Sequence, residues 1–152
     1  MYKVVIDTNI LISASYDEFS YAWKIIDLVI QGKIKAVASE KILKENRLII
    51  ERAIKNKRDK QEIENFLARV EVVPVYKKIK AVKFDPEDDK FIECAAEVGA
   101  DFIISSDSHL LELGEYGKTK ILTPKDFWFL YCGKKKDKDD EWRELFKDMF
   151  RK

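Results

Sequence analysis

Residues 2–11 read YKVVIDTNIL, and this stretch decides the fold. The apolar run that ends at Ile6 leads directly into Asp7, and a helix-like stretch follows through Ile12. A short continuous apolar run with polar boundaries is typical of a strand that is buried on both faces. A buried strand followed at once by a helix indicates the first unit of an alternating α/β fold.

The same alternation continues along the chain. After residues 2–6, strands are predicted at residues 34–38, 70–75, 101–105 and 120–122. Helical spacing of apolar residues predicts helices at residues 20–30, 39–53, 61–68, 86–98 and 123–132, with the charged stretch 55–60 breaking the long second one. Pro74 favours a sheet-edge position for the third strand, because proline lacks a backbone N–H. The pattern predicts a mostly parallel sheet with helices on both faces.

Length and composition predict one globular domain. The chain has 152 residues, 46% of them hydrophobic and 38% charged, which is enough to bury a sizeable core. The domain is expected to span residues 1–132. Residues 133–152 are expected to form a polar linker and an amphipathic helix over Glu141–Phe150. That helix either packs on the domain's own core or contacts a second copy or another partner.

The charge balance and the cysteines exclude several classes of protein. Lys and Arg total 29 against 28 Asp and Glu, which argues against a polycation that coats nucleic acid but permits a basic rim around an acidic centre. Cys94 and Cys132 lie in apolar runs and indicate buried thiols in a reducing compartment. One His and two isolated Cys cannot build the usual zinc site. No signal peptide or membrane span is evident, so a cytoplasmic location is expected.

Acidic residues follow the predicted strands and begin the predicted helices. Asp7 and Asp107 come after the strands at residues 2–6 and 101–105, and the carboxyl ends of parallel strands form the ligand edge of such sheets. Asp88 and Asp89 lie in the first turn of one helix, and Glu45 lies within another. Carboxylates that converge repel one another, and a divalent cation such as Mg²⁺ or Mn²⁺ relieves that repulsion.

Each acidic residue also has a purely structural interpretation. A lone Asp after a strand commonly caps the next helix, which applies to Asp7 and Asp107. Asp88 and Asp89 are favourable at a helix N-terminus because of the helix dipole, and Glu45 fits a solvated helix surface. Spacing alone therefore leaves a metal site as one of two interpretations.

Three motifs carry a resemblance to a known family. They are DTNIL at residues 7–11, DDKFIECA at residues 88–95 and ADFIISSDSHLL at residues 100–111. In this order and spacing they resemble the PIN-domain family, over roughly residues 1–131, and look closest to its prokaryotic branch of VapC-like toxin components. The resemblance implies a three-layer α/β/α domain with a parallel five-stranded sheet in the order 3-2-1-4-5. It also implies a ribonuclease that depends on Mg²⁺ or Mn²⁺.

The resemblance also implies the roles of individual residues. Asp7, Glu45, Asp89 and Asp107 match the family's acidic, metal-binding positions, and Asp89 is preferred over Asp88 because it precedes the pair Phe91-Ile92 by the family's spacing. Supporting roles fall to Asn9, Ser106 and, as an auxiliary ligand, Asp88. Glu40 and Glu51 are rivals of Glu45, and His109 is interpreted as a turn residue or substrate contact.

The expected reaction is in-line hydrolysis of RNA by water activated by one or two metal ions. Asp7, Asp89 and Asp107 would hold the ions, and Glu45 would hold the second ion or orient the water. Basic residues could bind the RNA backbone, first Lys41 and Arg47 and then a more distant group: Arg52, Lys55, Lys57 and Arg58. The resemblance further implies a cognate antitoxin protein and a homodimer.

Two other functions are weighed against a ribonuclease. A haloacid-dehalogenase-like phosphatase needs a second Asp two residues after the first, and Asn9 stands there instead. A PIN-like fold kept only as an RNA- or protein-binding module is the second alternative. The intact set of acidic residues argues against that module.

Overall fold

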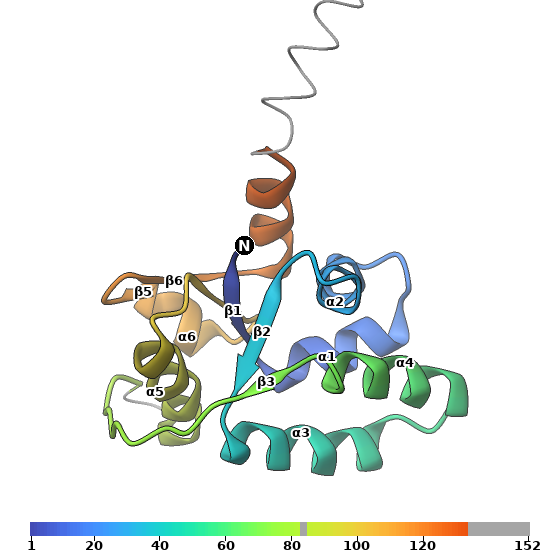
Figure 1. Cartoon of the computed structure of the whole chain (residues 1–152), viewed down its shortest axis with the longest axis horizontal. Coiled ribbons are helices and arrows are strands. Elements are labelled where there is room, and N and C mark those ends of the chain that lie inside the picture. Colours follow the sequence, from blue (N-terminus) through green and yellow to red (C-terminus); the bar gives the residue numbers. More distant parts are fainter. Residues whose placement is uncertain (83–84, 134–152) are drawn as a thin grey trace, which may run out of the picture.

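The computed structural model describes residues 1–82 and 85–133, and its centre is one mixed sheet (Figure 1). The strands are β1 (Lys3–Ile6), β2 (Lys35–Ala38), β3 (Glu71–Val72), β4 (Phe102–Ile104), β5 (Glu115–Tyr116) and β6 (Thr119–Leu122), in the order β3-β2-β1-β4-β6-β5. Every pairing is parallel except that of β5 with β6. The predicted order of five parallel strands is confirmed, with the predicted strand at residues 120–122 appearing as β6.

The sixth strand is an addition that the sequence analysis missed. β5 is only two residues long and folds back on β6 through a tight turn at Gly117, whose φ of 58° lies in the left-handed region that glycine adopts most easily. A strand this short gives no alternating pattern that a sequence can show. It extends the sheet by one antiparallel edge and leaves the predicted α/β class unchanged.

Helices cover both faces of the sheet (Figure 1). They are α1 (Thr8–Tyr16), α2 (Tyr21–Ile30), α3 (Glu40–Ala53), α4 (Lys57–Leu67), α5 (Asp89–Val98) and α6 (Ser108–Leu113), with a short 3-10 turn, η1 (Pro86–Asp88), directly before α5. Residues 124–133 are also helical. The three-layer α/β/α arrangement expected from the sequence is therefore confirmed.

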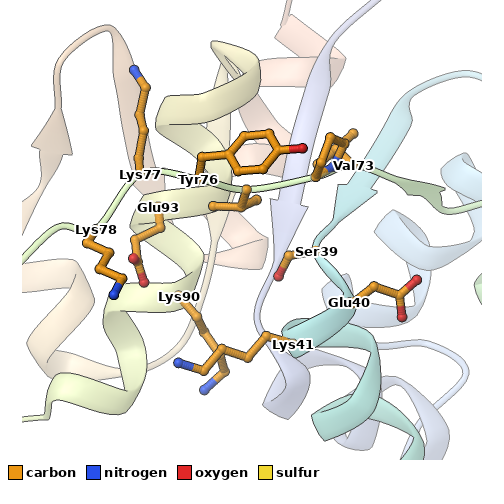
Figure 2. A pocket seen from close by; sticks show the side chains of 11 residues that line it. Ser39, Glu40, Lys41, Val73, Tyr76, Lys77, Lys78, Lys90 and Glu93 are labelled. Carbon is orange, nitrogen blue, oxygen red and sulfur yellow. The ribbon is translucent and has the colours of Figure 1, made fainter.

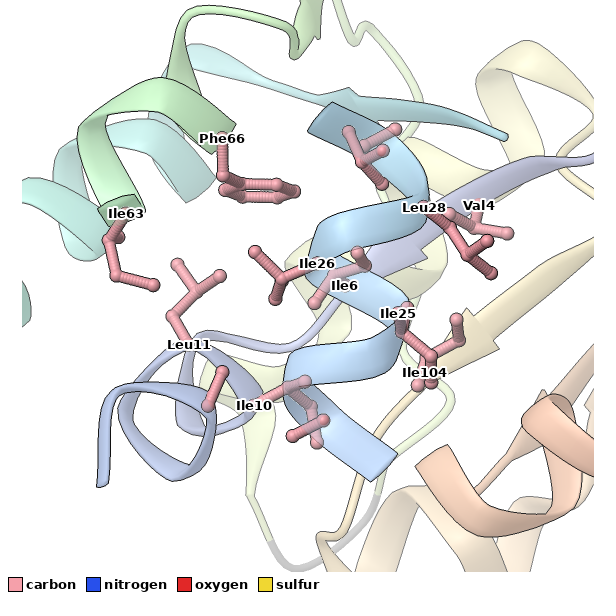
Figure 3. Close-up of a cluster of buried hydrophobic side chains, with 14 of the residues drawn as sticks. Val4, Ile6, Ile10, Leu11, Ile25, Ile26, Leu28, Ile63, Phe66 and Ile104 are labelled. Carbon is pink, nitrogen blue, oxygen red and sulfur yellow. The ribbon is translucent and has the colours of Figure 1, made fainter. Parts of the chain in front are cut away.

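Side chains alternate along β1 and so divide the core into two. Val4 and Ile6 face a cluster formed mainly with α1, α2 and α4 (Figure 3), whereas Val5 faces a second cluster with α5 and the first turn of α3. Ile10 and Leu11 of α1 are fully buried in the first cluster. Full burial of such a side chain stabilises the fold by about 1.5–3 kcal/mol. The apolar run that opened the sequence thus lies at the centre of both cores.

Some element boundaries differ from the predictions. α4 begins at Lys57 and not at residue 61, because Asn56 caps it by accepting from the N–H groups of Arg58 and Asp59. β3 ends at Val72, and the chain then runs without regular structure toward η1, but β3 does lie at the sheet edge as Pro74 suggested. Of the predicted linker and terminal helix at residues 133–152, residues 134–152 lie outside the described residues.

Two further expectations concern the cysteines and the membrane. Cys94 is a buried free thiol and Cys132 a partly buried one, and burial raises the pKa of the Cys94 thiol to about 11. Cys94 is therefore an unreactive core residue. In residues 1–82 and 85–133 no helix is both long and apolar enough to cross a membrane.

Candidate active site

Asp7 and Asp107 end the neighbouring strands β1 and β4 and cap the helices that follow. Asp7 Oδ1 accepts from the Asn9 N–H at 3.3 Å, and Asp107 Oδ1 accepts from the N–H groups of His109 at 2.8 Å and Leu110 at 3.2 Å. The Asp7 N–H donates to the Ile104 carbonyl at 3.0 Å, which continues the β1–β4 ladder past the end of the strand. The capping interpretation is thus correct, and it places both carboxylates at the ligand edge.

One buried hydroxyl joins the two strand ends. Ser105 Oγ donates to Asp7 Oδ2 at 2.7 Å and accepts from the Asp107 N–H at 3.0 Å. Ser105 is fully buried, whereas Ser106, the serine singled out in the sequence, is exposed. The register explains the difference, because Ile6 pairs with Ile104 and the next residues, Asp7 and Ser105, therefore meet.

Glu45 reaches the site from α3 and is held by two donors. The Thr8 hydroxyl lies 2.6 Å from Glu45 Oε2 and 2.7 Å from Asn46 Oδ1, and its single proton can serve only one of them. Lys90 Nζ lies 3.0 Å from Glu45 Oε1. Each Glu45 oxygen thus has one donor group within hydrogen-bond distance, and α3 contacts α1 and α5 at this point.

Lys90 is a buried cation that the sequence analysis did not foresee. Its side chain is 4% exposed, and its Nζ also donates to the Glu87 carbonyl at 2.7 Å and lies 4.9 Å from the centre of the Phe91 ring. A buried ammonium is costly unless it is paired and hydrogen-bonded, and Lys90 is both. The only signal in the sequence was a lysine in the first turn of a helix that otherwise turns apolar residues inward.

The two rivals of Glu45 lie elsewhere on α3. Glu40 is exposed in the first turn, and Glu51 pairs with Lys60 at 3.7 Å with its side chain 79% exposed. Among these three glutamates, Glu45 alone contacts Thr8 and Lys90. Glu45, chosen from its place in the helix after the second strand, is therefore the one of the three whose carboxylate lies between α1, α3 and α5.

Asp88 and Asp89 have opposite surroundings. Asp89 Oδ1 accepts from the N–H groups of Ala81 at 3.0 Å and Val82 at 2.8 Å, so its carboxylate fastens the chain just before η1 to the start of α5. Asp88 is also buried, but its Oδ2 has no hydrogen-bond partner among the described residues. A buried carboxylate oxygen without a donor is costly, and such an atom is a candidate for a bound cation.

The pKa values show which carboxylates influence one another. The pKa of Asp88 is raised to about 7, first by burial and then by the negative charges of Asp107, Asp85 and Asp7, against the opposing effect of Lys90. Burial likewise raises the pKa of Asp7, and the charges of Asp107 and Glu45 add to that effect. Asp7, Glu45, Asp88 and Asp107 thus form one electrostatically connected group, called the acidic centre below.

The donor set of the acidic centre suits a hard divalent cation. All its ligand atoms are carboxylate oxygens, which Mg²⁺ and Mn²⁺ prefer, and Asp88 offers an oxygen that nothing else uses. In the described part of the chain, however, no three His, Cys, Asp or Glu side chains already stand close enough to hold an ion. The chemistry of these donors suits a cation such as Mg²⁺, which keeps several waters and takes few protein ligands.

The residues predicted to contact substrate are spread more widely. His109 Nδ1 lies 4.0 Å from Asp107 Oδ1, which places the ring beside the acidic centre. Lys41 lines a cavity next to the first turn of α3, whereas Arg47 is exposed further along that helix. The Asn9 side chain is exposed, and the contact of this residue with Asp7 comes from its backbone N–H.

The fold and the acidic centre together define a class: three-layer α/β proteins that gather carboxylates where the strand order reverses beside β1. Comparison with known proteins narrows that class. A family model described as "PIN domain" matches residues 3–109. The chain belongs to the PIN-domain family.

Two individual proteins are similar to this chain. A protein of Methanocaldococcus jannaschii named "Uncharacterized protein MJ1680" is 33% identical over 138 residues, which cover 82% of this chain and 88% of the relative. A chain in a crystal structure of VapBC2 from Rickettsia felis, bound to a DNA fragment from their promoter, superposes with a TM-score of 0.53. That match covers 78% of this chain and 96% of the other at 12% identity, so it shows a common fold.

Proposed function

We propose that this protein is a metal-dependent ribonuclease that hydrolyses phosphodiester bonds in RNA. The observation that carries the proposal is the acidic centre, in which the buried Asp88 Oδ2 has no partner among the described residues and the charges of Asp7 and Asp107 act on it. Membership of the PIN-domain family supports it, because PIN domains are generally nucleases.

In this proposal Asp7, Asp88 and Asp107 hold Mg²⁺ or Mn²⁺, and Glu45 completes the centre. A bound divalent ion activates water and neutralises the charge that develops on the phosphate. Asp89, which the family's spacing favours, is assigned a positioning role here, because its carboxylate already binds two backbone N–H groups.

Other residues of the chain keep the carboxylates in place. The Ser105 hydroxyl fixes the orientation of Asp7 relative to Asp107. Lys90 and Thr8 fix Glu45 by one bond to each of its oxygens, and Lys90 offsets part of the negative charge. This preorganisation lowers the cost of assembling like charges before the ion binds.

We further propose that the protein is the toxin of a toxin–antitoxin pair, acts in the cytoplasm and forms a homodimer. The fold it shares with a chain of the Rickettsia VapBC2 complex supports this assignment. A cognate antitoxin would then be a second partner besides RNA. Copurification of the chain with the product of a neighbouring gene tests the pairing directly.

The test of the ribonuclease proposal is the Asp7→Asn variant. Asparagine can still accept the capping hydrogen bond from the Asn9 N–H, so the fold should remain intact while the charge that binds metal is lost. We expect cleavage of a defined end-labelled RNA to fall at least about a hundredfold, the order expected when an ion that activates water and stabilises charge is lost.

The controls are circular dichroism of the variant and a thermal-shift titration with Mn²⁺. Cleavage that survives in Asp7→Asn, prepared free of contaminating nuclease, would refute the assignment. A wild-type chain that binds Mn²⁺ but never cuts RNA would instead favour the non-catalytic binding module. The phosphatase alternative predicts release of phosphate from phosphomonoesters, which a malachite-green assay measures.

A further inference from the structure

The extended segment at residues 73–82, which follows β3, presents two different sides. Val73, Val75 and Ile79 pack against the second core cluster. Tyr76, Lys78 and Lys80 point outward and are exposed, Tyr76 at 81%. Side chains of an extended chain alternate between its two sides, so the inward apolar residues hold the segment while the outward residues form a row.

Two adjoining cavities lie along this row. The first has a volume of about 440 Å³ and lies between the segment, the first turn of α3 and α5 (Figure 2). The second, of about 810 Å³, continues toward Pro86, and the two share Lys41, Lys78 and Glu93 in their walls. Together they form a trough over an apolar floor, called the lysine groove below.

The lysine groove combines unpaired positive charge with an exposed aromatic ring. Its walls carry Lys41, Lys77, Lys78 and Lys80, and none of these has an ion-pair partner within residues 1–82 and 85–133. The acidic residues in the walls are Glu40, Glu93 and Asp89, and the Asp89 carboxylate binds backbone N–H groups. In Figure 2 the Tyr76 ring lies above the cavity that these lysines border.

Lys90 connects the groove with the acidic centre. Lys90 forms part of its wall, and the Lys90 ammonium lies 3.0 Å from Glu45. Lys41 precedes Glu45 by four residues on α3, so the two side chains leave the same face of that helix one turn apart. A ligand that follows the groove past Lys41 would therefore reach the carboxylates.

We propose that the lysine groove binds a single strand of RNA and leads it to the acidic centre. Lys41, Lys78 and Lys80 contact the backbone phosphates, and the Tyr76 ring stacks on an unpaired base. Cations along a groove combined with an exposed aromatic ring are the recognition pattern of single-stranded nucleic acid. The choice of RNA rests on the proposed function, whereas the preference for a single strand rests on the exposed ring, which a paired base cannot stack upon.

The test uses the full chain carrying Asp7→Asn, so that RNA is bound and not cut. Fluorescence anisotropy measures the affinity for a short labelled single-stranded RNA of mixed sequence. Reversing two charges, Lys78→Glu with Lys80→Glu, should weaken binding roughly tenfold or more. The slope of log K against log salt should become shallower by about 1.4, because each phosphate contact on a single strand contributes about 0.7.

A matched control carries Lys33→Glu with Lys118→Glu. Both lysines are exposed and precede β2 and β6, at the amino ends of the strands and away from the acidic centre. The control makes the same change in net charge, so it should keep affinity within about twofold if the contacts are local. Equal losses in the groove variant and in the control would overturn the proposal, as would wild-type binding by the groove variant.

The stacking contact has its own pair of variants. Tyr76→Ala should weaken single-strand binding roughly 5- to 150-fold, the cost of one lost base stack, and Tyr76→Phe should retain it. A fully paired RNA duplex should bind Tyr76→Ala as well as it binds the parent chain. The stacking role would be contradicted if Tyr76→Phe lost binding, or if Tyr76→Ala weakened the binding of duplex and of single strand equally.

Failure of this inference is separable from failure of the ribonuclease proposal. If the Asp7→Asn chain binds RNA through the groove but the parent chain never cuts RNA, the inference about the groove is supported and the ribonuclease proposal is refuted. If the parent chain cuts RNA and the groove variants bind and cut as the control does, only the inference about the groove is refuted.

Discussion

Asp88 and Asp89 are neighbours in sequence with separate tasks. The Asp89 carboxylate accepts from the N–H groups of Ala81 and Val82, whereas the buried Asp88 carboxyl is under the influence of the charges of Asp107, Asp85 and Asp7. No pattern of residue types distinguishes the two, because the direction of each side chain depends on the passage from a 3-10 turn to an α-helix between them. This is the part of the site that a sequence cannot specify.

Substitution at these two positions should give opposite results. Asp88→Asn should abolish stabilisation by Mn²⁺ while leaving the metal-free fold as stable or slightly more so, because an unpartnered buried carboxylate is removed. Asp89→Ala should lower the free energy of unfolding by about 2 kcal/mol, because two backbone N–H groups lose their acceptor, and should retain the Mn²⁺ response. Urea unfolding with and without Mn²⁺ measures both, and the reverse pattern would restore Asp89 as the ligand.

The pH dependence of stability gives an independent test of Asp88. Because the pKa of Asp88 is raised from 3.8 to about 7 in the fold, the folded state binds more protons than the unfolded state between those values. Stability of the metal-free protein should therefore fall as the pH rises from about 4 to about 7. Unfolding curves in EDTA across that range should show the fall in the parent chain and a smaller one in Asp88→Asn. An equal fall in stability in the parent chain and in Asp88→Asn would assign the effect to other groups. Asp7, whose pKa is also raised, is the first candidate.

At the scale of elements, the pair formed by Lys90 and Glu45 fastens α5 to α3. Apolar periodicity located both helices correctly, and α5 ends at Val98 as predicted. The contact between them was not predictable, because it depends on how the helices cross and not on either helix alone. α4 shows the opposite difficulty, since the capping residue Asn56 was present in the sequence but lay inside a charged run that looked like a break.

The Lys90–Glu45 contact can be measured by a double-mutant cycle. Lys90→Met should lower the free energy of unfolding by about 1–3 kcal/mol, because the 35% exposed Glu45 carboxylate loses its ion-pair partner. In a chain that already carries Glu45→Gln, the same change should cost clearly less. Urea unfolding of the parent, the two single variants and the double variant gives the coupling, and strictly additive costs would show that the pair contributes nothing.

At the scale of the whole molecule, one topological fact brings the acidic centre together. β1 lies between β2 and β4 in the sheet. The chain forms β2 on one side of β1 and later β4 on the other side. Because these strands are parallel, the residues that follow each of them lie at the same edge of the sheet. Strand and helix alternation predicted this edge, and Asp7 and Asp107 were located on it from sequence. The fold was therefore more predictable than the details of the site, which depend on register and on side-chain direction.

Binding of a divalent ion should stabilise the whole domain. At a free Mn²⁺ concentration one hundred times the dissociation constant, linkage gives about 2.7 kcal/mol. For a domain of this size that corresponds to a rise in Tm of roughly 5–11 °C. Differential scanning fluorimetry should show the rise, EDTA should reverse it, and Asp107→Asn should remove it. A rise that persists in Asp107→Asn would place the ion elsewhere.

The two hydrogen bonds from Asp89 to residues 81 and 82 connect the acidic centre with the lysine groove. The segment that they anchor carries Tyr76, Lys78 and Lys80, and the residue directly before Asp89 is Asp88, a proposed ligand of the ion. Ligands bound at two such places on one short stretch of chain are thermodynamically linked, and linkage is reciprocal. Whatever factor the ion adds to the affinity for an RNA strand, the strand must add to the affinity for the ion. The acidic centre would then bind its ion most tightly when an RNA substrate is present.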